Sequence, residues 1–145
     1  MVSADIINSD GPASKDKFQQ YYMVITLTNT QDTNIRFTVM TCSWSESFRF
    51  DTDSIYLYYP GCDSNFPTTI EILPHKTVKF FGILTCYKKN RNAINPPSFK
   101  IAFLDLPYND WFLFPYSHED KLKYKTYWSD SIKLERKLYS YEEEK

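Results

Sequence analysis

The stretch YYMVITLTN at residues 21–29 gives the clearest structural signal in this chain. Apolar side chains stand at every second position, at Met23, Ile25 and Leu27, which is the period of a β-strand with one buried face. A turn rich in Asn, Asp and Thr follows, and a second alternating segment covers residues 35–42. Two alternating segments joined by a short polar turn are typical of a β-hairpin, so the sequence predicts one here.

Further short alternating segments recur along the chain, with turn residues between them. No segment keeps the apolar spacing of a helix over three turns, although residues 133–144 could form a short C-terminal helix. The pattern predicts an all-β, antiparallel β-sandwich of about seven to nine strands, built as a single domain over residues 1–145 with a charged tail at 140–145. The other expected strands are an edge strand at residues 6–7 and segments at 48–50, 55–59, 68–73, 77–86, 99–103, 124–128 and 132–138.

The composition of the chain narrows the possible functions. Its 17 lysines and arginines nearly balance 18 acidic residues, which gives a net charge of −1, whereas phosphate-binding proteins usually carry a basic stripe. We therefore expect no nucleic-acid partner. No apolar run reaches the roughly 18 residues that span a bilayer, so we expect no transmembrane segment. No secretory signal is visible, and the start at Met1 fits either a native beginning or the replacement of a removed signal peptide.

The residues that usually carry catalysis or bind metals are sparse. His75 and His118 are the two histidines, whereas a zinc site needs three or four ligands. A catalytic triad needs a base beside its nucleophile, but neither histidine has an evident nucleophile nearby in the sequence. Three glycines are too few for a phosphate-binding loop. Two acidic pairs could contribute to a calcium site, but aspartate is also an ordinary turn residue, so we predict no catalytic residue, no metal site and no cofactor. The two pairs are Asp51 with Asp53 and Asp105 with Asp110.

The three cysteines, Cys42, Cys62 and Cys86, allow at most one internal disulfide. Cys42 and Cys86 each end an apolar segment, which favours small buried side chains at both positions. Cys62 lies in a turn-like stretch after Pro60 and Gly61, which makes a disulfide between Cys42 and Cys62 an alternative. The sequence leaves both arrangements open, and a count of free thiols distinguishes them.

Aromatic residues make up 18% of the chain, more than one small core requires. In the segment IYLYY, a period of two places Ile55 and Leu57 on one face of a strand and Tyr56 and Tyr58 on the other. If the first face is buried, both tyrosines are exposed and available to a ligand. Trp111 lies in a second aromatic segment and is the third candidate binding residue. Amphipathic rings of this kind suit protein interfaces and also stack on sugar rings.

Three segments resemble a pattern common in small immunoglobulin-like β-sandwich proteins of the bacterial cell envelope. They are VITLTNT at 24–30, ILPHKTVKF at 72–80 and YWSDSIKL at 127–134. In such domains the first is a core strand that enters a polar turn, the second is a strand pair around a tight turn, and the third is the closing strand. The resemblance implies an immunoglobulin-like fold and a location outside the cytoplasm, and it carries over no catalytic residue. The Cys…Trp…Cys spacing of antibody domains is not matched, since Trp44 lies only two positions after Cys42.

These observations favour a non-enzymatic domain that binds a protein or a component of the cell envelope through its loops or an aromatic face. A first alternative is a carbohydrate-binding module, which requires exposed, coplanar aromatic rings. A second alternative is an enzyme, or an inhibitor of one, which requires a polar cluster such as Cys86 with Asp110 and His118. The fold class does not decide among them, because β-sandwiches host many functions, and the oligomeric state is open.

Overall fold

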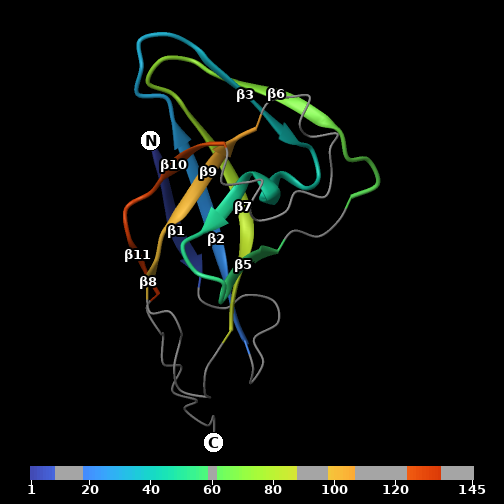
Figure 1. Ribbon diagram of the computed structural model, residues 1–145, viewed down its shortest axis with the longest axis vertical. Helices are drawn as coiled ribbons and strands as arrows, with labels where there is room; N and C mark the ends of the chain where they lie inside the picture. The colour runs from blue at the N-terminus through green and yellow to red at the C-terminus, as the bar shows by residue number, and fades with distance from the viewer. Residues whose placement is uncertain (9–17, 59–61, 88–97, 107–123, 135–145) are drawn as a thin grey trace, which may run out of the picture.

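The chain forms an all-β structure in a computed structural model that describes residues 1–8, 18–58, 62–87, 98–106 and 124–134 (Figure 1). These residues form eleven β-strands and one short 3-10 helix, η1 at Trp44–Ser47, and they contain no α-helix. The strands are β1 (Val2–Asn8), β2 (Phe18–Thr28), β3 (Ile35–Met40), β4 (Phe48–Phe50), β5 (Ile55–Tyr58), β6 (Pro67–Ile72), β7 (Thr77–Tyr87), β8 (Ser98–Phe99), β9 (Ile101–Asp105), β10 (Lys125–Trp128) and β11 (Ile132–Lys133). One residue separates β8 from β9, and β11 follows β10 along the same edge. If β8 and β9 are counted as one strand and β10 and β11 as another, the described residues contain nine strands.

All strand pairs are antiparallel, and the strands form two facing layers (Figure 1). One layer is the four-stranded sheet β1-β2-β7-β5, named sheet A below. The other layer contains the sheet β10-β9-β4, which β11 and β8 continue. The pair β3-β6 packs against this second layer through the rings of Phe37 and Phe103, whose centroids are 4.9 Å apart. The antiparallel β-sandwich predicted from the sequence is confirmed.

Two of the passages between the layers, from β2 to β3 and from β6 to β7, lie side by side (Figure 1) and are called the first and second crossing below. β2 pairs with β7 as far as Thr28 and Thr77, and beyond the two turns β3 pairs with β6 from Ile35 and Ile72 onward. The predicted hairpin between β2 and β3 is therefore wrong, and so is the strand pair expected around the turn at residues 73–76. Instead, β2 pairs with β7 and β3 pairs with β6, so each strand pairs with a strand of the other crossing. The sequence did not predict this, because a polar turn indicates a change of direction but does not specify which strand lies alongside.

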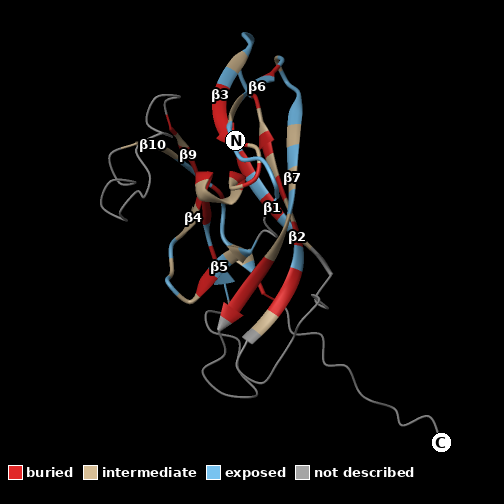
Figure 2. Cartoon of the chain, turned by 90° about the vertical axis from the view of Figure 1, so that its right-hand side faces the viewer, coloured by how far each residue is buried: buried red, intermediate tan, exposed pale blue. Residues whose placement is uncertain are grey.

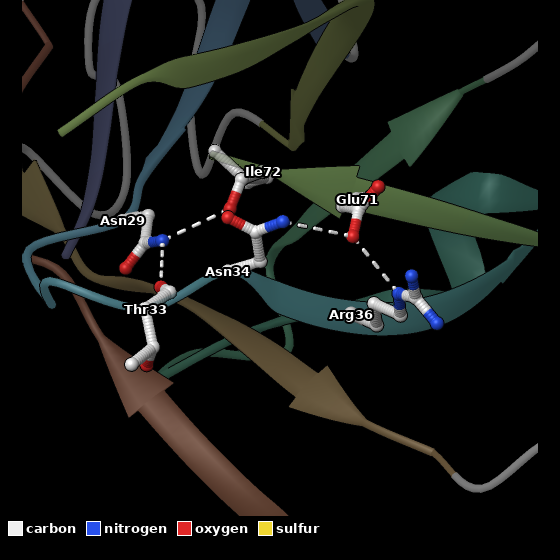
Figure 3. A network of polar contacts seen from close by, with 6 residues as sticks. All are labelled: Asn29, Thr33, Asn34, Arg36, Glu71 and Ile72. Atoms are coloured by element: carbon white, nitrogen blue, oxygen red, sulfur yellow. Dashed lines mark hydrogen bonds and ion pairs between the residues drawn. The ribbon is translucent and has the colours of Figure 1, made fainter. Parts of the chain in front are cut away.

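Asn29 fixes the first crossing through its side chain (Figure 3). The residue is 1% exposed, and its Nδ2 donates hydrogen bonds to the carbonyl oxygens of Thr33 and Ile72 at 2.8 and 2.9 Å. Its Oδ1 accepts a hydrogen bond from the backbone N–H of Gln31 at 2.9 Å. One buried amide therefore ties its own turn to the end of β6, and satisfies backbone groups that would otherwise lack partners.

The second crossing is held against the first by backbone hydrogen bonds. The N–H of His75 donates to the carbonyl of Asn29, and the N–H of Asn29 donates to the carbonyl of Lys76, both at 3.0 Å. His75 has a φ of 57°, the single positive value among the described non-glycine residues. Its exposed imidazole Nε2 lies 2.9 Å from Oδ1 of Asp32 in the facing turn, so this histidine has a structural role in the crossing.

A network of exposed polar side chains follows on the β3-β6 ladder (Figure 3). Arg36 and Glu71 are directly opposite each other, and Nε of Arg36 donates to Oε1 of Glu71 at 3.0 Å. Nδ2 of Asn34 donates to the same oxygen at 3.1 Å. The hydrogen bonds from Arg36 and then Asn34 lower the pKa of Glu71. Exposed ion pairs of this kind add little stability. The main effect of the network is to hold the side chain of Arg36 beside Glu71.

The core lies between the layers, where the inner faces of the strands meet (Figure 2). Met23 and Ile25 of β2 are fully buried, as their alternation predicted, and Leu84 of β7 packs in the same cluster. Residues of both layers contribute to this cluster, which extends to Phe99 and Ile101 in β8 and β9. The buried positions of β2 thus follow the predicted period of two, whereas β3 and β9 each bury four successive residues, so the alternation expected for them is not found.

Phe48 stands at the centre of an aromatic group inside this core. Its ring centroid lies 5.9 Å from that of Trp44, 5.4 Å from that of Phe80 and 5.6 Å from that of Phe103. Phe80 belongs to sheet A and Phe103 to the facing layer, so Phe48 bridges the two layers. Edge-to-face and tilted ring pairs contribute stability beyond the area that they bury.

The C-terminal helix expected over residues 133–144 is not found where the chain is described. Lys133, at which it would begin, belongs to strand β11, since it pairs with Ser98. The rest of that segment and the charged tail at 140–145 lie outside the described residues.

Candidate functional site

The two tyrosines predicted to be exposed lie on the outer side of β5. Ile55 is buried, whereas Tyr56 and Tyr58 are 41% and 48% exposed, so the predicted alternation is confirmed. Their participation in binding stays a prediction. Trp111, the third candidate binding residue, lies outside the described residues.

The register of sheet A extends this pair of tyrosines into a larger aromatic surface. Tyr58 is directly opposite Ile83 of β7, and Ile83 is directly opposite Tyr22 of β2, so the three side chains form one row across the sheet. In the next row, Phe81 of β7 is opposite Val24 of β2. Tyr22 is 40% exposed and Phe81 is 64% exposed. We name this surface the outer aromatic face, made of Tyr22, Val24, Tyr56, Tyr58, Phe81 and Ile83.

Polar groups beside the outer aromatic face are either engaged or peripheral. In the register of sheet A, Tyr56 is opposite Thr85, and Thr85 is opposite Gln20. Nε2 of Gln20 donates a buried hydrogen bond to Oγ1 of Thr85 at 3.2 Å. Charged residues flank the face, with Asp5 opposite Val24 and Lys79 in the row beyond. The centre of the face is therefore uncharged.

Sequence reasoning missed Tyr22 and Phe81, although a signal for both was present. Each has the parity opposite to the buried apolar residues of its strand, such as Met23 in β2 and Leu84 in β7. Parity predicts exposure, but only the register between β2, β7 and β5 brings these rings beside Tyr58.

A groove of about 390 Å³ adjoins β5 and brings together two features that the sequence predicted, the exposed tyrosines and the disulfide. Tyr56 and Tyr58 line it, and the disulfide between Cys42 and Cys62 forms another part of its wall. The carboxylate of Glu46 also contributes to the lining. Oδ1 of the neighbouring Asn65 accepts hydrogen bonds from the N–H groups of Cys42 and Ser43, which holds this wall in place. The groove can offer a ligand aromatic, hydroxyl and carboxylate groups.

The cysteines divide into one disulfide and one free thiol. Cys42 and Cys62 are bonded, with Cα atoms 5.7 Å apart, which is the alternative that the sequence left open. Cys86 is free and fully buried, and burial raises the pKa of its thiol to about 12. A thiol with such a pKa is neutral at physiological pH and is a poor nucleophile, so Cys86 lacks the properties of a catalytic cysteine. Asp110 and His118, its proposed partners in an enzyme site, lie outside the described residues.

A thiol titration tests this division. We expect the native protein at pH 8 to show no reactive thiol with Ellman's reagent, because Cys86 is buried and protonated and the other two cysteines are bonded. In denaturant without a reductant, we expect one thiol per chain. A native-state reaction would contradict the burial of Cys86, and three thiols in denaturant would contradict the disulfide.

Asp51, one of the residues considered for metal binding, has a structural partner. Oδ1 of Asp51 accepts a hydrogen bond from the N–H of Lys100 at 2.8 Å, and the N–H of Asp51 donates to the carbonyl of the same lysine. Asp51 thus joins the turn after β4 to the link between β8 and β9. Within the described residues, no three His, Cys, Asp or Glu side chains gather closely enough to hold a metal ion. The same part of the chain contains no helix that is long and apolar enough to cross a membrane.

Comparisons of this chain with known protein families, with curated proteins and with solved structures find no match. The functional argument therefore rests on the side chains themselves.

Proposed function

We propose that this β-sandwich is a non-enzymatic binding domain that recognises a protein partner through the outer aromatic face. The observation that carries the proposal is that the side chain of Phe81 is 64% exposed although it lies in β7, one of the two central strands of sheet A. An exposed large apolar side chain surrounded by further apolar and aromatic side chains is typical of an interaction surface. Tyrosine and phenylalanine are also among the residues enriched at protein interfaces.

A protein partner fits this face better than a glycan does. Sugar hydroxyls need hydrogen-bonding groups around the aromatic rings, but the positions between the rings are filled by Ile83 and Val24. The nearest polar pair, Gln20 and Thr85, is already joined by a hydrogen bond. An uncharged apolar centre with charges at its periphery matches the usual division of a protein interface into a dry core and a polar rim.

A location outside the cytoplasm and an immunoglobulin-like identity belong to the same proposal. The disulfide between Cys42 and Cys62 supports the location, because disulfides persist in oxidising compartments and are rare in the cytosol. The resemblance of three segments to cell-envelope sandwich proteins points in the same direction. The partner is then another protein of the envelope or of the extracellular medium.

Matched surface variants test the proposal. A protein that the immobilised domain captures from envelope extract is purified, and its affinity is measured by calorimetry for the wild-type chain and for Phe81→Ser, Tyr58→Ser and Leu73→Ser. We expect the first two substitutions to weaken binding about tenfold or more, because central aromatic residues carry most of the energy of an interface. Leu73 is 52% exposed in the turn between β6 and β7, outside the outer aromatic face, so Leu73→Ser should retain full affinity.

Two outcomes would argue against this proposal, and a third would identify the partner. Equal affinity of all variants would show that the captured protein binds elsewhere. A specific hit on a glycan array that Tyr56→Ser or Tyr58→Ser abolishes would favour the carbohydrate-binding alternative at the groove beside β5, and its loss with EDTA would indicate calcium. Self-association that Phe81→Ser removes in analytical ultracentrifugation would identify the partner as a second copy of this chain.

A further inference from the structure

A separate cleft of about 310 Å³ opens at the end of the sandwich where β2 turns toward β3. Four of its apolar side chains are buried, namely Val2 of β1, Leu27 of β2, Phe37 of β3 and Phe103 of β9. Ile35, which is half-buried, and Met1, which is exposed, complete the apolar lining. The volume lies at the lower end of the range for ligand sites, about 300–1,000 Å³, which favours a small ligand.

Two side chains of opposite charge line the cleft beside each other. Asp105 of β9 and Lys125 of β10 are direct partners in the strand register, so their side chains project from the same face. Nevertheless, no ion pair joins them in the described part of the chain. Nζ of Lys125 lies instead over the ring of Tyr127, 5.2 Å from its centroid. Burial raises the pKa of Asp105, while the charge of Lys125 lowers it in part.

The half-buried carboxylate of Asp105 therefore has no hydrogen-bond or ion-pair partner among the described residues. A partly desolvated charge without a partner is unfavourable, and a ligand cation would relieve this cost. Arg36 also borders the cleft, where the hydrogen bond from its Nε to Glu71 engages part of its guanidinium, and the amino group of Met1 donates to the carbonyl of Thr28. Lys125 is the cation directly opposite Asp105 in the strand register. The cleft thus offers one carboxylate, cationic groups and an apolar floor.

We propose that this cleft binds a small zwitterion with an apolar side chain, as a free α-amino acid such as leucine or phenylalanine is. The ligand ammonium pairs with Asp105, the ligand carboxylate pairs with Lys125, and the apolar side chain enters the floor formed by Leu27, Phe37 and Phe103. This site is distinct from the outer aromatic face and does not depend on it.

A series of ligand analogues tests the proposal on the full chain. Binding of L-leucine is measured by calorimetry or by NMR titration and is compared with 4-methylpentanoate, which lacks the ammonium, and with isoamylamine, which lacks the carboxylate. We expect each analogue to bind about tenfold more weakly than L-leucine, because each loses one charge-assisted contact. No binding of leucine or phenylalanine at millimolar concentration, or equal binding of leucine and its analogues, would overturn the proposal.

Two substitutions assign the charges. In Asp105→Asn, L-leucine and 4-methylpentanoate should bind equally, because the partner of the ammonium is gone. In Lys125→Gln, L-leucine and isoamylamine should bind equally for the converse reason. Lys100→Gln removes an exposed lysine that does not line the cleft and should leave the affinities unchanged. Undiminished discrimination in both cleft variants would refute the assignment, and if a variant fails to fold, the analogue series on the wild-type chain decides alone.

Discussion

Replacement of Phe48 by alanine is expected to lower the free energy of unfolding by about 4 kcal/mol, within the range for removal of a buried phenylalanine. The side chain is 5% exposed and contacts the rings of Trp44, Phe80 and Phe103. Alanine would leave a cavity between the two layers, and the surrounding rings belong to η1, β7 and β9, which cannot all move inward together. Urea unfolding followed by tryptophan fluorescence measures the change.

Phe81→Ala is the matched control for this loss. It removes the same atoms from a side chain that is 64% exposed, so we expect less than about 1 kcal/mol of destabilisation. The two variants should also separate in function, because Phe81→Ala removes the centre of the proposed interface without weakening the core. Similar losses of stability in both variants would show that Phe48 does not bridge the layers as described.

Asn29→Ala is the second substitution with a large expected effect, about 3–4 kcal/mol of destabilisation. It removes the hydrogen bonds to the carbonyl groups of Thr33 and Ile72 and to the N–H of Gln31. The carbonyl of Ile72 then stays buried without that partner, and the methyl group of alanine cannot compensate. Chemical denaturation measures this loss, with the m-value as a check that the unfolded state is unchanged.

Asn34→Ala is the control for Asn29, since it removes the same type of side chain from the same turn. Asn34 is exposed, and its hydrogen bond to Glu71 is open to water, so we expect a change within about 0.5 kcal/mol. If Asn34→Ala cost as much as Asn29→Ala, the stability of the crossing would come from the turn as a whole and not from the buried amide.

Strand positions could be predicted from the sequence, but strand partners could not. The alternation at residues 21–29 identified β2 and its buried face, because side-chain period is a local property of the chain. The polar residues after Asn29 are those of an ordinary hairpin turn, and nothing in their types reveals that Asn29 is buried against Ile72. The pairing of β2 with β7 and of β3 with β6 depends on contacts between distant segments, and these determined which predictions were wrong.

The candidate sites show the same limit. Exposure of Tyr56 and Tyr58 followed from the alternation in β5, and Phe81 could have been found from the parity of β7. The outer aromatic face, however, exists only because the register aligns Tyr58, Ile83 and Tyr22. Asp105 was considered only as half of an acidic pair with Asp110, since its proximity to Lys125 arises from the pairing of β9 with β10.

The two crossings also bear on how this protein unfolds. Because β2 continues into β3 and β7 follows β6, the ladder in sheet A and the β3-β6 ladder share the same two stretches of chain. Separation of one ladder displaces the ends of the strands in the other, so neither ladder can open as an independent cooperative unit. We expect amide protons of β3 and β7 to exchange with solvent through one global opening, and folding to be slow, because both ladders close large loops before their contacts are gained.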